Sequence, residues 1–469
     1  MEIMLLSNFN NILEFECSNF KVLYNLNNAK MVSIKNEYFK YKNMFLEKND
    51  FFETKASITN YTKVIIAVNI TSSCNLRCKY CFNDKKSLIK VDVEKIKKFI
   101  DYIVHTKSSA EKYFVDLAGS GEPLIYINDI IEIAKYCHKV SDIVGKEVTP
   151  MLSTNGILLS TKYISILQDN GVLFGVSLDG YKELHDRYRV DINDNPTYEI
   201  IKNNILKIKF NDYVGGSMTI VDSNTDIFKA YIEMSKLFKT ISIRPARMSY
   251  QNFDFTFINK GYNDFIDYLI NQTLIKNYDL LYRVINGDDL LGKTILKIIS
   301  NSKLSRRCEA GIARFSLGID GKIYPCTPAS YHKDLEITKE QIERGENNKY
   351  FDFFPKKCEK CIARNVCGTD CYVQLYENSF NDELCVLKRN IFMLSVYFCG
   401  KIEITDFNVY CEIVNMANII INRNRYDKEL NDLFLKCSNK YSFTELKKLK
   451  DNNKKKYNRI IKKYTQINK

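Results

Sequence analysis

The chain has 469 residues, a length typical of about three domains, and a formal net charge of +13. No apolar run approaches the roughly 20 residues of a membrane-spanning helix and no charged-then-apolar leader follows Met1, so we expect a cytoplasmic protein without a membrane partner. Fifteen cysteines, several with C-x2-C spacing, favour metal ligands in a reducing compartment and exclude a small disulfide-stapled scaffold.

Residues 1–62 form a separate amino-terminal segment in our interpretation. Apolar and polar residues alternate over 13–17, 20–24 and 31–34, with a turn at Asn27-Asn28. This pattern predicts a small sheet, and the rest of the segment has room for one helix.

Residues 63–290 alternate apolar, strand-like runs with longer segments of helical period, which predicts parallel strands joined by crossover helices. The expected strands are 64–70, 113–118, 148–153, 173–178, 217–221 and 241–247. The expected helices are 93–105, 127–138, 162–169, 198–207, 227–238 and 262–275. Six such units are too few to close an eight-stranded barrel, so the fold class is α/β with a partial (β/α)6 TIM-like barrel. In such folds the chemistry lies at the carboxyl ends of the strands.

Three cysteines follow the first expected strand with the spacing C-x3-C-x2-C: Cys74, Cys78 and Cys81. Three thiolates can hold three corners of a four-iron cluster and leave the fourth iron open to another molecule. The alternatives are reduced thiols without a role or a zinc knuckle, which needs a fourth ligand and finds no histidine nearby.

This segment, with an aromatic residue at Tyr80, resembles the cluster loop of the radical S-adenosylmethionine (SAM) enzymes, whose fold is an open six-unit barrel. The resemblance implies a [4Fe-4S] cluster on Cys74, Cys78 and Cys81, with SAM bound to its open iron. It implies reductive cleavage of SAM to a 5′-deoxyadenosyl radical, with the protein positioning the carbon to be attacked and excluding solvent.

Other strand ends resemble the SAM-binding motifs of that family. Gly119-Ser120-Gly121-Glu122-Pro123 is similar to its Gly-Gly-Glu-Pro motif, with Ser120 in place of the first glycine. The resemblance assigns SAM contacts to these five residues and to Ser153, Asn155, Ser177, Asp179 and Arg189.

Four further residues near these motifs have less definite assignments. Arg187 is the alternative to Arg189 for the SAM carboxylate, and His185 is expected to be a structural partner of a nearby carboxylate. Arg244 and Arg247 either face the cavity or close the end of the barrel.

A second set of cysteines occupies residues 300–390: Cys308, Cys326, Cys358, Cys361, Cys367, Cys371 and Cys385. It resembles the seven-cysteine signature of the SPASM domain, which holds two auxiliary four-iron clusters. By that resemblance Cys308, Cys326 and Cys371 bind the inner cluster, and Cys358, Cys361, Cys367 and Cys385 bind the outer one, giving three [4Fe-4S] clusters in all. A zinc ribbon on Cys358, Cys361, Cys367 and Cys371 is the alternative and leaves three cysteines unused. Residues 319–322 predict a hairpin turn that carries Cys326 back toward the sheet.

The stretch Glu309–Arg314 has no cysteine where some relatives place a fourth ligand. The inner cluster could therefore keep an open iron that accepts a substrate thiolate, unless Cys399 or water fills that position. Cys17, Cys137, Cys411 and Cys437 show no ligand spacing and are expected to be buried thiols.

Residues 391–469 are expected to form a helical basic tail. Basic residues gather at Lys447, Lys448, Lys450, Lys454, Lys455, Lys456, Arg459, Lys462 and Lys463. A solvated helix is the simpler interpretation, and a surface for an acidic peptide or nucleic acid is the alternative. No RNA-binding module is recognisable, so we do not expect a nucleic-acid substrate.

These resemblances imply a radical SAM peptide maturase that cross-links side chains of a ribosomally made precursor peptide, through a thioether or carbon–carbon bond. Residues 1–62 would then cap the barrel or recognise the peptide, and a flavodoxin or ferredoxin would supply electrons. An anaerobic sulfatase-maturating enzyme shares both cysteine sets, but its acidic base directly after the cysteine matching Cys326 is replaced here by Thr327. A non-catalytic electron-transfer protein is the alternative from another class.

Overall fold

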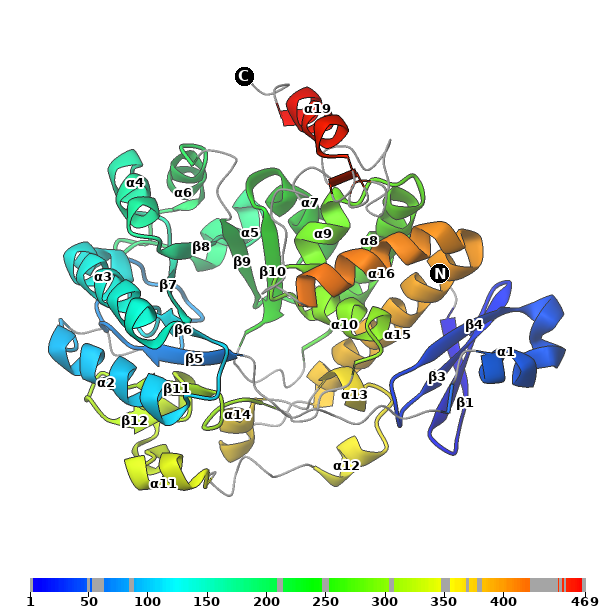
Figure 1. Ribbon diagram of the computed structural model, residues 1–469, viewed down its shortest axis with the longest axis horizontal. Helices are drawn as coiled ribbons and strands as arrows, with labels where there is room; N and C mark the ends of the chain where they lie inside the picture. Colours follow the sequence, from blue (N-terminus) through cyan, green and yellow to red (C-terminus); the bar gives the residue numbers. More distant parts are fainter. Residues whose placement is uncertain are drawn as a thin grey trace.

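The computed structural model describes residues 3–48, 51–52, 63–83, 88–208, 214–246, 253–302, 308–346, 355–367, 371–377, 382–421, 446, 449–450 and 453–465. An eight-stranded sheet forms its centre and a four-stranded sheet lies at its amino-terminal side (Figure 1). One continuous apolar core connects the two.

Six parallel strands in chain order make up most of the central sheet, so the predicted partial barrel is confirmed. They are β5 (Lys63–Val68), β6 (Lys112–Asp116), β7 (Glu147–Thr154), β8 (Leu173–Ser177), β9 (Gly215–Ile220) and β10 (Thr240–Pro245). The helices between and after them are α2 (Val93–Thr106), α3 (Ile127–Val144), α4 (Thr161–Asp169), α5 (Lys182–Tyr188), α6 (Tyr198–Ile205), α7 (Ile227–Leu237) and α8 (Thr256–Leu274).

Local sequence explains where these helices start and which face they bury. At α2 the Asp92 carboxylate accepts the Lys95 amide at 3.1 Å, which satisfies an amide that has no partner within the helix. Ile96, Ile100 and Ile103 follow at helical spacing and are fully buried against the sheet. The helix therefore packs by one apolar stripe, as the period of its sequence predicts.

A hairpin from the cysteine-rich region extends the barrel sheet beyond β5. The sequence analysis predicted the turn of this hairpin but not its pairing with β5. Its strands are β11 (Arg314–Leu317), parallel to β5, and β12 (Ile323–Tyr324). The predicted turn at 319–322 joins them, and Gly321 adopts a φ of 77°, a conformation that favours glycine. The hairpin places Arg314 beside the barrel strands, in register with Ile65.

The amino-terminal sheet is antiparallel, with β1 (Ile3–Phe9), β2 (Ile12–Cys17), β3 (Phe20–Asn25) and β4 (Met31–Lys35), and α1 (Lys42–Lys48) follows it. Three of its strands were predicted. The fourth, β1, is mostly exposed and has no alternating apolar side, so its sequence carried little signal.

Thirteen further helices lie in the described residues, among them the short 3-10 helices η1 (Asn36–Tyr41), η3 (Pro328–Tyr331) and η4 (Lys333–Leu335). Two follow α8, namely α9 (Asp279–Ile285) and α10 (Leu290–Ile299); the others are α11 (Lys339–Arg344), α12 (Lys356–Glu359), α13 (Arg364–Cys367), α14 (Tyr372–Tyr376), α15 (Asp382–Thr405), α16 (Phe407–Ile421), α19 (Lys454–Thr465) and the 3-10 helix η2 (Pro123–Tyr126). The predicted helical tail is present in α19, where Tyr457 and Ile460 are buried while Lys454 and Arg459 are exposed. In the part of the chain that the structure describes, no helix has the length and apolar character needed to span a membrane. The predicted domain boundaries stay predictions.

Candidate active site

A cavity of about 790 Å³ opens at the carboxyl ends of the barrel strands. It is lined from β6 by Asp116, from β7 by Ser153, from β8 by Ser177, from β9 by Ser217 and Thr219, and from β10 by Ser242 and Arg244. Polar side chains at inward positions of successive parallel strands therefore face one space, as expected for this fold.

Cys74, Cys78 and Cys81 all line this cavity. Backbone hydrogen bonds fix their loop: the Arg77 amide donates to Val190 O at 2.8 Å, and the Lys79 amide donates to Tyr188 O at 2.9 Å. Burial raises the pKa of the Cys78 thiol, while the Arg189 guanidinium opposes that rise and favours the thiolate. Three thiols on one wall of a cavity, beside a buried cation, fit an iron–sulfur cluster.

The glycine-containing loop packs directly against the cysteine loop. A Cβ on Gly121 would lie 2.1 Å from Ser73 O, and one on Gly119 would lie 2.3 Å from Asn69 Oδ1. Both positions therefore need glycine because another chain segment approaches too closely for a side chain. The Glu122 amide donates to Ser73 O at 2.8 Å and completes the contact.

Glu122 joins the ends of β6 and β7. Its buried carboxylate accepts the Asn155 amide at 2.7 Å, the Thr154 hydroxyl at 2.7 Å and the Leu124 amide at 3.0 Å. Burial raises its pKa and these donors oppose the rise. Its hydrogen-bonding capacity is used within the protein, so Glu122 holds the cavity wall in shape.

Arg189 lines the cavity and takes part in a buried hydrogen-bond chain. Its guanidinium donates to the Tyr80 hydroxyl at 2.6 Å, and that hydroxyl donates to Asp179 Oδ2 at 2.6 Å. The residue is 8% exposed, and its buried Nε has no hydrogen-bond partner among the residues that the structure describes. A buried, unsatisfied cation in a cavity wall suits a ligand carboxylate, such as that of SAM.

Residues 68–226 match the family model of the radical SAM superfamily. This chain carries a radical SAM domain. Along its sequence it is similar to the cysteine-type anaerobic sulfatase-maturating enzyme of Clostridium novyi (strain NT), 26% identical over 55% of this chain and 71% of that protein. It is also similar to the corresponding enzyme of Clostridium perfringens (strain ATCC 13124), 23% identical over 75% of this chain and 97% of that protein. The solved structure of anSMEcpe with bound AdoMet shares the fold, with a TM-score of 0.53 at 18% identity, over 75% of this chain and 99% of that one.

The structure separates the predicted SAM contacts into two groups. Those that line the cavity of the radical SAM domain are Gly119, Ser120, Gly121, Glu122, Ser153, Asn155, Ser177 and Arg189. Pro123 and Asp179 are buried behind that wall and do not line it, because Pro123 begins η2 and Asp179 holds Tyr80 and the Thr219 amide.

The structure also tests the predictions for three residues near these motifs. Arg187 pairs with Asp222 at 2.6 Å outside the cavity, which leaves Arg189 as the candidate for the SAM carboxylate. His185 is structural, but the expected carboxylate partner was wrong: its ring nitrogens meet the Asp179 amide and the Thr197 hydroxyl, both at 3.1 Å. Burial lowers its pKa to about 2, so the ring is neutral. Arg247 lies outside the described residues.

Three of the carboxyl-terminal cysteines come together near the cavity. Cys326 is buried, and burial raises the pKa of its thiol to about 12, with Cys371 and Cys308 close enough to raise it further. The Tyr372 hydroxyl lies 3.5 Å from its sulfur. The three proposed ligands of the inner cluster thus lie within electrostatic range of one another.

The four proposed ligands of the outer cluster lie on α12, α13, the turn between them and the first turn of α15. The Cys361 amide donates to Cys358 O at 3.2 Å, and Lys357 binds Asp382 at 2.5 Å, which ties α12 to the start of the helix that carries Cys385. Across the described ranges, no three His, Cys, Asp or Glu side chains lie close enough together to hold a single metal ion. A four-iron cluster differs from such a site, because each of its cysteines binds a different iron.

The cysteines without ligand spacing follow the prediction in part. Cys17 and Cys137 are buried, but Cys411 is exposed on α16, contrary to expectation. Cys399 is buried on α15 beside Glu403, whose neighbour is Ser33 of the amino-terminal sheet. Cys437 lies outside the described residues.

The sequence analysis did not single out several residues that line the cavity. Asp116 and Arg314, which lie close enough to interact electrostatically, were missed, although a charged residue at the end of an apolar strand is a usable signal. Asp288, which lines the cavity, and Lys293, which pairs with it, had no such signal, because they follow β10 by more than 40 residues and reach its end only through the fold.

Proposed function

We propose that this protein is a radical SAM enzyme that removes hydrogen from a residue of a peptide or protein substrate. The observation that carries the proposal is the single cavity shared by Cys74, Cys78 and Cys81, the glycine loop and the unsatisfied Arg189. A bound cluster with SAM would supply a radical able to take hydrogen from an unactivated carbon. The peptide class rests on the relatives, since anSMEcpe is also solved with AdoMet and a Cp18Cys peptide.

The residues of this chain would bind and orient the reactants. Arg189 would hold the SAM carboxylate, and Gly119, Ser120 and Gly121 would bring backbone close to the rest of the molecule. The inward serines of β7 and β8 would bind its polar groups. Burial of the cavity floor would exclude water from the reaction.

For the product, we propose a side-chain cross-link. Thr327 follows Cys326 where the sulfatase-maturating enzymes carry an acidic base, and it cannot replace that base. Cys308, Cys326 and Cys371 supply three thiols to the inner cluster, so a substrate thiolate could be the fourth ligand. Cysteine clusters of this type imply a reducing cytoplasm and a flavodoxin or ferredoxin as electron donor.

Formylglycine formation is the second candidate, because the similarity to sulfatase-maturating enzymes extends over 97% of the Clostridium perfringens protein. The two candidates differ in product. A cross-link removes two hydrogens and keeps every sulfur, whereas formylglycine made from cysteine loses two hydrogens and also has oxygen in place of sulfur. Formylglycine made from serine also removes two hydrogens, but it leaves an aldehyde.

The test is anaerobic co-expression with each short open reading frame beside the gene, followed by intact mass and fragmentation of the peptide. We expect loss of two hydrogens or a multiple of two, no reaction with a hydrazide probe, and no change in the Cys74→Ala variant. A hydrazide-reactive product, or loss of sulfur, would support formylglycine instead. An unchanged mass for every peptide would count against peptide cross-linking.

A further inference from the structure

A second cavity of about 360 Å³ adjoins the SAM cavity. Arg244, Pro245, Ala246 and Asp288 line both. The second cavity extends from them to Lys293, to Cys371 of the proposed inner cluster, and to Lys388 of α15. The two spaces therefore meet at Arg244 and Asp288, on the side of the barrel that faces the cysteine-rich region.

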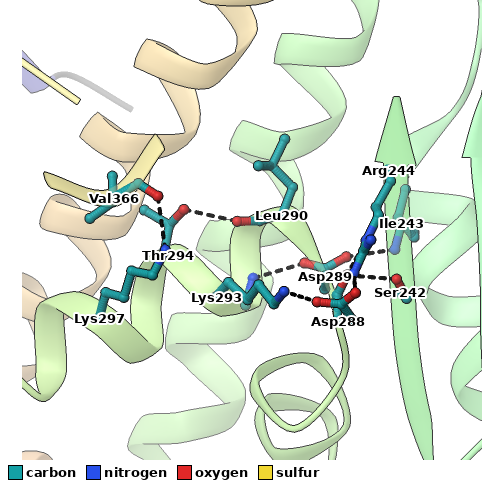
Figure 2. A network of polar contacts seen from close by, with 11 residues as sticks. Ser242, Ile243, Arg244, Asp288, Asp289, Leu290, Lys293, Thr294, Lys297 and Val366 are labelled. Carbon is teal, nitrogen blue, oxygen red and sulfur yellow. Dashed lines mark hydrogen bonds and ion pairs between the residues drawn. The ribbon is translucent and has the colours of Figure 1, made fainter. Parts of the chain in front are cut away.

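The loop between α9 and α10 holds Asp288 in place against β10 (Figure 2). Asp288 O accepts the Ser242 hydroxyl at 2.7 Å and Arg244 Nε at 2.5 Å. A Cβ on Gly287 would lie 1.8 Å from Ile241 O, so only glycine allows the loop to approach the strand this closely. The position of Asp288 is thus fixed by the backbone on both sides of it.

Asp289 anchors the same loop through its side chain. Its fully buried carboxylate accepts the Tyr231 hydroxyl at 2.9 Å, the Ile243 amide at 2.8 Å and the Gly292 amide at 2.8 Å. Burial raises its pKa to about 6. These contacts use its oxygens, so Asp289 supports the site and does not offer a carboxylate to a ligand.

The side chains that surround Asp288 are charged and partly exposed to solvent. Arg244 and Lys293 both pair with the Asp288 carboxylate, and their side chains are 47% and 51% exposed (Figure 2). Two cations thus share one carboxylate, and Lys388 adds a third cation to the wall of the second cavity. The lining of the second cavity holds these three cations and two carboxylates, Asp288 and Asp289, so its net charge is positive and a carboxylate of a ligand can bind between Arg244 and Lys293.

We propose that Arg244 and Lys293 bind an acidic side chain of the peptide substrate, an aspartate or glutamate close to the residue modified in the SAM cavity. This inference rests on the proposed function, since it assumes a peptide that crosses from one cavity to the other. A peptide suits the site because the two cavities share four lining residues, so a few residues of an extended chain can reach from one cavity to the other. The ion pairs with Asp288 keep both cations in position before the substrate arrives.

The experiment uses the full-length enzyme, reconstituted with iron and sulfide, immobilised and supplied with SAM. It is offered two matched pools of synthetic peptides with a central cysteine, which differ only in carrying Glu or Gln at the flanking positions. Retained peptides are counted by mass spectrometry, and dithionite is then added to test for modification. We expect the enzyme to retain the Glu pool over the Gln pool by about fivefold, as for one partly exposed ion pair.

The Lys293→Glu variant should lose or reverse this preference. Lys236→Glu is the matched control: Lys236 is exposed, pairs with Glu233 at 2.6 Å and lines neither cavity, so the variant should behave as the wild type. If Lys293→Glu does not fold, Lys293→Gln replaces it, and the preference should then disappear. Equal retention of both pools by the wild type, or an unchanged preference in the Lys293 variant, would overturn the inference. Selective retention without any modified peptide would support the acidic site and count against the proposed function.

Discussion

Individual residues of the radical SAM domain divide into those that face the cavity and those that hold the first group in place. Glu122 belongs to the glycine-containing SAM motif, but its carboxylate accepts hydrogen bonds from three groups of the protein itself. Arg189 lines the cavity, and its Nε is not used by any described residue. Hydrogen-bond satisfaction, which the sequence does not contain, decides which charged residue remains available to a ligand.

Arg189→Gln should weaken SAM binding by about tenfold, because it removes one charge-assisted hydrogen bond to a carboxylate. The measurement is the SAM dissociation constant of the reconstituted protein under anaerobic conditions. Arg187→Gln is the control, since Arg187 is 55% exposed and pairs with Asp222 outside the cavity. Equal affinities for the two variants, at equal iron content, would remove Arg189 from the SAM site.

The parts of the site that could be predicted are those whose motif lies within a short stretch of sequence. Cys74, Cys78, Cys81 and the glycine loop were predicted because each motif is short and follows a strand. The pairing of Arg244 with Asp288 was not, because 44 residues and two helices separate them. His185 was correctly taken as structural, but its partners proved to be an amide and a hydroxyl, since its burial and tautomer depend on tertiary packing.

At the scale of elements, α15 links the cysteine-rich region to the amino-terminal sheet. Its first turn carries Cys385, and Phe392 packs edge-on against Phe15 at 6.1 Å and Tyr24 at 5.2 Å in the amino-terminal sheet. These contacts of α15 could not be predicted from the sequence. A helix that is buried on several sides has no single apolar stripe, so its amphipathicity is low. Strands β5 to β10 were easier to predict than the contacts of α15, since each strand has two distinct faces and its sequence therefore alternates.

Glu403 on α15 makes the junction with the amino-terminal sheet sensitive to pH. Burial raises its pKa to about 7, Ser33 opposes part of the rise, and within the described part of the chain its buried Oε2 has no hydrogen-bond partner. Because the folded pKa lies above the unfolded value of about 4.3, the stabilising neutral form is lost as pH rises from about 4.3 through about 7. We expect the melting temperature of the wild type to fall over that window.

Glu403→Gln should flatten this dependence, because an amide stays neutral at every pH in the window. Thermal melts at a series of pH values, with wild type and variant compared at each one, give the measurement. The control is Glu346→Gln, which replaces an exposed carboxylate that pairs with Arg344 at 3.7 Å. A parallel decline for wild type and Glu403→Gln would contradict the assignment.

For the whole molecule, the main prediction concerns its metal content. Three clusters require about 12 iron atoms per chain, about four in each. Alanine at Cys74, Cys78 and Cys81 together, or at Cys308, Cys326 and Cys371 together, should each remove about four. Iron and sulfide analysis after anaerobic reconstitution checks this.

Cys411→Ala, at an exposed cysteine without ligand spacing, should keep the full iron content. Zinc in place of iron at Cys358, Cys361, Cys367 and Cys371 would support the zinc ribbon. An unchanged iron content in the Cys308, Cys326 and Cys371 variant would contradict the inner cluster.

The loop that fixes Asp288 has one more effect, on self-association. Strand β10 ends the central sheet on one side, and an edge amide of this kind can pair with a strand from another molecule. Here the Ile243 amide is taken by the Asp289 carboxylate, and at the opposite side the sheet ends in β12, which has only two residues. Both margins of the barrel sheet are thus poor templates for strand addition, which should help a long-lived open barrel resist aggregation while its clusters are being inserted.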